Sequence, residues 1–199
     1  MPKDTFFNLP EEKRNKIIDS AMIQFSNKHY NKVTIDSIVD EAKIPKGSFY
    51  QYFTNKNDLY TYMFNRLGDT KSEMLSTVKN YVDTMSFSDC IIKMLEISVQ
   101  YETDDDNISQ LNNKFLNECP QEIKNEILKN EIPKSYRLLE QIIKEYVLKG
   151  ELRKDLDIKN ASYIITSCAL NIEHYELTNG DISETLRTVI NVVVDGFKN

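Results

Sequence analysis

The sequence has few of the features that mark secreted, membrane-bound or metal-binding proteins. Its three cysteines, Cys90, Cys119 and Cys168, are far apart and form no Cys-x-x-Cys motif, which argues against a disulfide framework and against a cysteine zinc site. Scattered thiols also suit a reducing compartment. The N-terminus lacks the apolar core of a signal peptide, and no apolar run approaches the ~18 residues that cross a membrane. We therefore expect a cytoplasmic protein with no membrane partner, no metal and no other cofactor.

Glycine and proline are also scarce, with five of each in 199 residues. Because these residues punctuate regular structure most strongly, their scarcity indicates few turns. Lys, Glu, Leu, Ile and Asn are frequent instead, and no convincing strand pattern is visible. Helix caps and apolar spacing predict an all-α protein of about nine helices. Pro120 and Pro133 are expected to divide the helices of their region, and Gly150 to end the helix that follows Pro133.

The charge balance is acidic, with a formal net charge of −6 at pH 7, which at first argues against nucleic-acid binding. The distribution of charge changes this view. Residues 1–56 contain 9 Lys and Arg against 7 Asp and Glu, whereas the remainder of the chain is strongly acidic. The basic excess is small, so DNA binding would depend on where individual lysines lie rather than on total charge.

The segment from Thr34 to Phe53 predicts two short helices joined by a tight turn. Thr34 is a good N-cap for the first helix, and the proline after Ile44 makes that residue the expected turn, because a residue before proline avoids the helical conformation. Phe49 and Phe53 are four residues apart, so both can pack on the first helix. The remaining side chains of the second helix are expected to face outward: Lys46, Gly47, Ser48, Tyr50, Gln51 and Tyr52.

An outward face of this composition suits the major groove of DNA, which admits one helix. Lysine and glutamine can bond base edges, serine and tyrosine can bond phosphates, and glycine lets the backbone come close. Thr34 and Lys56 lie at helix N-termini, where backbone N–H groups attract phosphate. Taken alone, Tyr50 and Tyr52 would more commonly pack between helices, and Lys46 and Lys56 would be solvated surface. Their occurrence together in one segment favours a DNA-reading helix.

The whole of this segment, from Thr34 to Lys56, closely resembles the signature of TetR-family regulators, and the match extends back to Phe25 and forward to Leu59. The resemblance covers the first third of the chain and implies a homodimer that binds a palindromic double-stranded operator. Two positions depart from the family pattern, because Lys43 stands where a small residue is usual and Pro45 where a serine is usual. The implied phosphate contacts are Thr34, Tyr50 and Lys56, and the implied groove surface is formed by Lys46, Gly47, Ser48, Gln51 and Tyr52.

We expect a DNA-binding helix-turn-helix domain over residues 1–56 and an effector-binding and dimerisation domain over residues 57–199. The last two helices carry apolar stripes that predict a four-helix dimer interface, with an intrachain core as the alternative. Dimerisation is favoured because DNA half-sites need two recognition helices about 34 Å apart. The predicted dimerisation residues are Ile165, Cys168, Ile172, Leu186, Val189, Ile190, Val193 and Phe197.

Aromatic and methionine side chains in the middle of the chain predict a pocket for a moderately sized apolar molecule. The family resemblance implies such an effector, whose identity the sequence does not reveal. Taken singly, each of these residues more commonly belongs to a plain core. The predicted pocket residues are Met63, Met94, Ile97, Tyr101, Phe115, Tyr136, Leu139, Tyr163 and His174.

The function predicted from the sequence is a transcriptional regulator, a repressor that a small apolar ligand releases from its operator. A regulator or activator without an effector is a second interpretation, and a helical enzyme or small-molecule carrier is a third. The third is weak because no catalytic constellation is recognisable, and because His29 and His174 have no metal-ligand spacing. The run Asp104-Asp105-Asp106 lacks the glycine and terminal glutamate of a calcium loop, so we interpret it as a helix cap or solvated loop.

Overall fold

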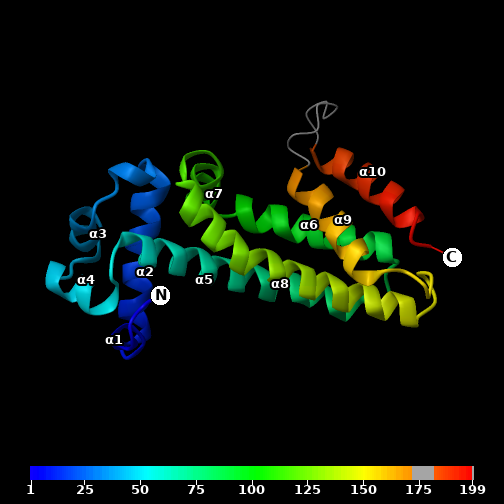
Figure 1. Cartoon of the computed structure of the whole chain (residues 1–199), viewed down its shortest axis with the longest axis horizontal. Coiled ribbons are helices and arrows are strands. Elements are labelled where there is room, and N and C mark those ends of the chain that lie inside the picture. The colour runs from blue at the N-terminus through cyan, green and yellow to red at the C-terminus, as the bar shows by residue number, and fades with distance from the viewer. Residues whose placement is uncertain (172–181, 199) are drawn as a thin grey trace. The chain divides into compact units, whose positions relative to one another are not determined.

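A computed structural model describes residues 1–171 and 182–198, which form ten α-helices and two short 3-10 helices (Figure 1). The described residues contain no strand beyond one isolated bridge between Leu152 and Lys198. The predicted all-α fold is confirmed. The short helix α1 (Asp4–Phe7) was not anticipated from the sequence, because four residues leave no periodic pattern. No described helix is long and apolar enough to cross a membrane.

The first of two compact units is formed by Met1–Thr70 and Tyr101–Glu131. Helix α2 (Glu11–Asn27) is central, because its apolar residues at helical spacing are buried and both α3 and α7 pack against it (Figure 1). Aromatic rings fill much of this core, including Phe25, Tyr30 and Tyr60. The other elements of the unit are α1, η1 (Tyr30–Lys32), α3 (Ile35–Ala42), α4 (Lys46–Tyr52), most of α5 (Lys56–Ser76), α7 (Asp106–Glu118) and the start of α8 (Gln121–Leu148).

The second compact unit is formed by Lys71–Gln100 and the described residues from Ile132 onward. Its core contains the fully buried Tyr146, whose ring centroid lies 5.2 Å from that of Phe87. The Tyr146 hydroxyl donates to the Met85 carbonyl at 3.0 Å, which satisfies its polar end. The elements of the unit are the end of α5, η2 (Thr77–Tyr81), most of α6 (Phe87–Thr103), the rest of α8, α9 (Ile158–Asn171) and α10 (Ile182–Asp195).

Helix α8 differs from the sequence expectation, because it continues through Pro133 instead of being divided there. An interior proline removes one backbone hydrogen bond and costs ~3 kcal/mol. Apolar residues are buried on both sides of it, Ile123 and Ile127 before and Ile142 and Ile143 after. These side chains stabilise the parts of α8 on either side of Pro133 within two separate cores, at ~1.5–3 kcal/mol each.

The turn between α3 and α4 is made by Lys43, and not by Ile44 as expected. Lys43 has φ 55° and is, among the described residues, the one non-glycine with a positive φ. A side chain in this left-handed conformation is strained by ~1–2 kcal/mol, and glycine relieves that strain at some cost in chain entropy. We expect Lys43→Gly to raise the free energy of unfolding by about 0.5–1 kcal/mol in urea titrations. Lys43→Ala keeps the strain and should give no gain, so equal gains for both variants would contradict this account.

Two buried tyrosines of the first unit make stability sensitive to alkaline pH. Tyr30 and Tyr60 lie with ring centroids 4.9 Å apart, and burial raises the pKa of both phenols well above the usual 10.0. The unfolded chain ionises them near pH 10 while the folded chain keeps them protonated. Stability is therefore intact below that pH and is lost as the pH rises beyond it.

The expected loss is up to ~1.4 kcal/mol per pH unit for each tyrosine, measured by urea unfolding between about pH 9 and about pH 11. Tyr60→Phe removes one ionising group, so the unfolding free energy of this variant should fall less steeply with pH. If the unfolding free energy falls equally steeply with pH in the wild type and in Tyr60→Phe, Tyr60 does not contribute to the alkaline loss of stability.

Candidate DNA-binding surface

Helix α3 begins at a complete capping box. The Thr34 hydroxyl accepts the Ser37 N–H at 3.1 Å, and the Ser37 hydroxyl accepts the Thr34 N–H at 3.3 Å. Both donors would otherwise lack partners at the helix start. The buried Ile38 and Ala42 then hold α3 against the core, and the N-terminal turn with Thr34 stays exposed.

Helix α4 begins at Pro45, whose φ of −62° suits a helix start without a side-chain cap. Lys46 follows, and its ammonium pairs with the Asp36 carboxylate of α3 at 2.7 Å. The hydrogen bond to Asp36 raises the pKa of Lys46. Both side chains are more than half exposed, so the pair is readily exchanged for another anion.

The seven residues of α4 divide into a buried and an exposed face. Phe49 and the C-cap residue Phe53 are fully buried, with ring centroids 5.6 Å apart, as their spacing predicts. Tyr50 is 45% exposed and rests edge-on against Phe49. The expected outward face is therefore confirmed for four positions: Lys46, Gly47, Tyr50 and Gln51.

Ser48 and Tyr52 are half-buried, so the expectation that they face fully outward is wrong in this respect. The Tyr52 ring packs against the first core, with its centroid 6.1 Å from that of Phe6. Tyr52 follows Phe49 by three residues, which brings it toward the same side of the helix. The groove roles predicted for Ser48 and Tyr52 remain predictions.

Lys56 is also half-buried, and it joins η1 to the start of α5. Its ammonium donates to the carbonyls of Tyr30 at 2.9 Å and Val33 at 3.0 Å, and it lies 4.5 Å from the centre of the Tyr30 ring. Burial lowers the pKa of Lys56. Two of its three N–H donors are therefore used within the protein, and its predicted phosphate contact depends on the third.

Sequence reasoning missed the N-terminal segment as part of this surface. The Lys3 ammonium donates to the Tyr50 carbonyl at 2.8 Å, the Lys3 N–H donates to the Tyr52 carbonyl at 2.8 Å, and the Thr5 hydroxyl donates to the Gln51 carbonyl. Lys3 and Thr5 precede their partners by more than forty residues. Neither helical periodicity nor capping patterns relate positions that far apart.

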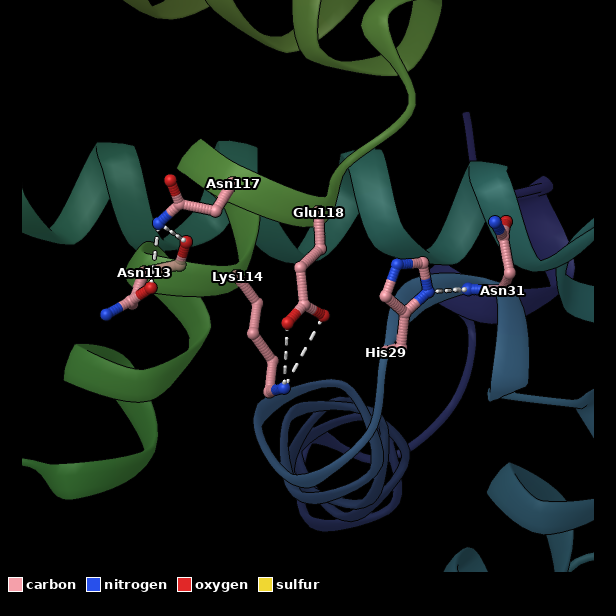
Figure 2. A network of polar contacts seen from close by, with 6 residues as sticks. All are labelled: His29, Asn31, Asn113, Lys114, Asn117 and Glu118. Atoms are coloured by element: carbon pink, nitrogen blue, oxygen red, sulfur yellow. Dashed lines mark hydrogen bonds and ion pairs between the residues drawn. The ribbon is translucent and has the colours of Figure 1, made fainter.

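His29 and Asp105 have structural roles at helix starts. The His29 ring accepts the Asn31 N–H at 3.2 Å and caps η1, as Figure 2 shows in one view with the Lys114–Glu118 pair of α7. Asp105 accepts the Asn107 N–H at 2.8 Å and caps α7, which agrees with the helix-cap interpretation of the acidic run. Neither His29 nor Asp105 therefore indicates a catalytic or metal-binding site.

The predicted effector residues are distributed over both compact units. Met63 and Phe115 are buried in the first core, and Tyr101 of the same unit donates to the Leu67 carbonyl at 3.2 Å. His174 lies outside the described residues. The others belong to the second unit, where Leu139 is buried, Tyr163 is largely exposed, and Met94, Ile97 and Tyr136 are half-buried.

The second unit also contains a recess of about 350 Å³ whose lining is polar and apolar in nearly equal parts. None of the predicted effector residues lines it. The residues that do are Lys79, Val82, Asp83, Gln141, Ile142 and Glu145.

The predicted dimerisation residues contribute mainly to the chain's own second core. Four of them, Ile165, Leu186, Ile190 and Phe197, are buried there, and Cys168, Val189 and Val193 pack against it. Ile172 lies outside the described residues. The same two helices also expose apolar side chains at three other positions: Tyr163, Ile164 and Val192.

Comparisons with known proteins agree with this geometry. Residues 17–63 match the family model for bacterial regulatory proteins of the tetR family. A fatty acid metabolism regulator protein of Bacillus subtilis is 24% identical over 202 residues, covering 95% of this chain and 99% of that protein. The biofilm operon icaADBC negative transcriptional regulator IcaR of Staphylococcus epidermidis is 40% identical over 47 residues, or 24% of this chain and 25% of that protein.

Solved structures share the fold over almost the whole chain. SmeT, the repressor of the multidrug efflux pump SmeDEF of Stenotrophomonas maltophilia, matches with a TM-score of 0.73 at 16% identity, covering 94% of this chain and 90% of that one. A complex of SmeT with triclosan matches with a TM-score of 0.71 at 15% identity, covering 95% and 93%.

Proposed function

We propose that the chain, a DNA-binding transcriptional regulator of the TetR family, acts as a repressor that a small apolar ligand releases from its operator. The family consists of regulators rather than enzymes. Repression is supported by two similar proteins, one named a negative regulator and one a repressor. We also propose that it acts in the cytoplasm, where its DNA target lies.

The observation that carries the DNA-binding proposal is the exposed face of α4. Lys46, Tyr50 and Gln51 are exposed on a helix whose opposite side is anchored by two fully buried phenylalanines. Such a helix presents donors and acceptors to a major groove while its backbone is held in place. Thr34 and Lys56, at the starts of the two neighbouring helices, are proposed as the flanking phosphate contacts.

We propose that two copies of the chain bind a palindromic operator. A pair of recognition helices is needed to contact two half-sites one DNA turn apart. The proposed interface is formed by α9 and α10, where Ile164 is 40% exposed and Val192 is 71% exposed. The buried dimerisation candidates would stabilise the two helices of this interface by packing them on the second core.

The effector is proposed to be an apolar molecule of the size of a fatty acid. The support is the similarity, over nearly the full length of both chains, to a fatty acid metabolism regulator. The triclosan complex of SmeT is a case of this fold with an apolar small molecule. Long-chain fatty acids are therefore the first compounds to test.

Selection of bound duplexes from a random double-stranded library tests the DNA-binding proposal. The wild-type protein should enrich a palindrome, and its affinity for that duplex should fall steeply with salt because phosphate contacts release counterions. Recovery of no specific duplex would refute the proposal. A monomer in sedimentation of the complex would refute the dimer.

Titration of long-chain fatty acids into the complex with the selected duplex tests the effector proposal. Release of the DNA at ligand concentrations that leave the protein folded would support it. If no fatty acid changes the affinity, a regulator with another effector or with none becomes the better account.

A further inference from the structure

The DNA-reading helix α4 depends on the N-terminal segment for its last turn. Its seven residues are too few to form a stable isolated helix, and its last carbonyls have no partners within it. Lys3 and Thr5 donate to three consecutive carbonyls, those of Tyr50, Gln51 and Tyr52. The C-terminal end of α4 is thus held by residues that lie outside the helix-turn-helix segment.

The donors themselves are fixed in place by Phe6. This side chain is fully buried, and its ring centroid lies 4.8 Å from that of Phe53 and 5.4 Å from that of Tyr62. The Phe6 N–H also donates to the Lys3 carbonyl at 2.9 Å. Lys3 and Thr5 therefore cannot shift far unless a buried aromatic ring moves with them.

The two ends of α4 are held by different means. At the start, the turn at Lys43 and the fixed φ of Pro45 set where the helix begins. At the end, the Lys3 ammonium meets the carbonyls where the helix dipole is negative, which favours a cation. Loss of the second set of contacts would let the last turn of the helix shift within the limits set by the buried Phe49 and Phe53, which moves its exposed side chains relative to a groove.

We propose that the segment Lys3–Phe6 positions the DNA-reading helix, with Lys3 and Thr5 as positioning residues that set its orientation for the operator. The inference rests on the proposed DNA binding. Neither side chain needs to touch DNA for this role. It predicts that loss of either contact lowers the preference for the operator over other sequences, and leaves non-specific binding through phosphates intact.

The experiment compares two duplexes: one that the wild type selects from a random library, and one with the same bases scrambled. Thr5→Val removes the donating hydroxyl at nearly constant volume, and Lys3→Met removes the ammonium. Each should weaken binding to the selected duplex about threefold to tenfold, the range for one hydrogen bond, and change binding to the scrambled duplex less than about twofold. Thr5→Ser keeps a hydroxyl and should restore the preference.

Two control variants separate positioning from other effects. Thr70→Val removes a comparable hydroxyl, which donates to the Arg66 carbonyl of α5 at 3.2 Å, and Lys129→Met removes an exposed lysine of α8. Neither control residue contacts α4, so both controls should bind as the wild type does. Salt titrations distinguish positioning from a direct phosphate contact, because positioning leaves the slope of log affinity against log salt unchanged.

Three outcomes would overturn the inference. Wild-type affinity of Thr5→Val for the selected duplex would remove the positioning role. Equal losses on both duplexes, with a salt slope reduced by about one for Lys3→Met, would make Lys3 a phosphate contact. If the loss of affinity for the selected duplex parallels a lower urea unfolding midpoint of the variant, the effect is one of stability and not of positioning. Failure of the wild type to select any duplex would instead refute the proposed function, so the two failures are distinguishable.

Discussion

Replacing Gly47 with alanine should weaken operator binding about tenfold or more while the protein stays folded and becomes slightly more stable. A Cβ at this position would meet no atom of the protein within 4 Å, so the fold has room for it. Alanine is the better helix former, which should add up to ~1 kcal/mol to the free energy of unfolding. The added methyl group would stand on the exposed N-terminal turn of α4, where the backbone is proposed to approach DNA. Overpacking of a close contact costs ~1–3 kcal/mol, and the middle of this range, ~2 kcal/mol, corresponds to about thirtyfold in affinity.

The opposite signs of the two effects make Gly47→Ala informative. Affinity is measured on the selected duplex, and stability by urea unfolding of the same preparation. Ser109→Ala, on the exposed surface of α7, is the matched control, because it also improves helix propensity and lies on a different helix. It should leave DNA affinity unchanged. Wild-type affinity of Gly47→Ala would mean that the backbone at Gly47 does not approach the groove.

Replacing Phe53 with alanine should lower the free energy of unfolding by ~3–5 kcal/mol, the largest loss among the substitutions proposed here. The side chain is fully buried, so its removal leaves a cavity in the core. Its ring centroid lies 4.8 Å from that of Phe6 and 5.6 Å from that of Phe49, so the cavity would open where the N-terminal segment meets α4. A loss of this size is a large part of the ~5–15 kcal/mol that stabilises a typical domain. DNA binding should fall with it.

Phe7→Ala is the control for this prediction. Phe7 is 47% exposed although its ring also contacts that of Phe6, with centroids 5.7 Å apart, so its removal should cost less than ~1 kcal/mol. Urea unfolding followed by circular dichroism measures both variants. Equal losses for the two variants would contradict the burial argument.

Much of the candidate DNA-binding surface could be predicted from the sequence because its determinants are local. The cap at Thr34, the helix start at Pro45 and the four-residue spacing of Phe49 and Phe53 all act within one or two helical turns, although the turn residue is Lys43 and not Ile44. Such patterns specify where helices begin, where they end and which side is buried. The exposed positions of α4 followed from the same spacing, as did the all-α fold.

Two of the residues whose surroundings differ from the sequence expectation, Tyr52 and Lys56, have contacts that are distant in the sequence. Tyr52 is half-buried because Phe6 packs against it, and the Lys56 ammonium is bound by the carbonyls of Tyr30 and Val33. Pro133 lies within a helix, with apolar residues buried in separate cores before and after it. Local propensity carries no information about such contacts.

The sequence by itself determined the helical class, the helix-turn-helix and four of the six residues expected on its exposed face, because backbone propensity and apolar periodicity are properties of neighbouring residues. Only the tertiary structure decided how that helix is held. It placed Lys3 and Thr5 on the last carbonyls of α4 and assigned apolar residues of α9 and α10, among them Ile165 and Ile190, to the chain's own core. These outcomes depend on which distant surfaces meet when the chain folds, and burial and hydrogen-bond satisfaction select among them only in three dimensions.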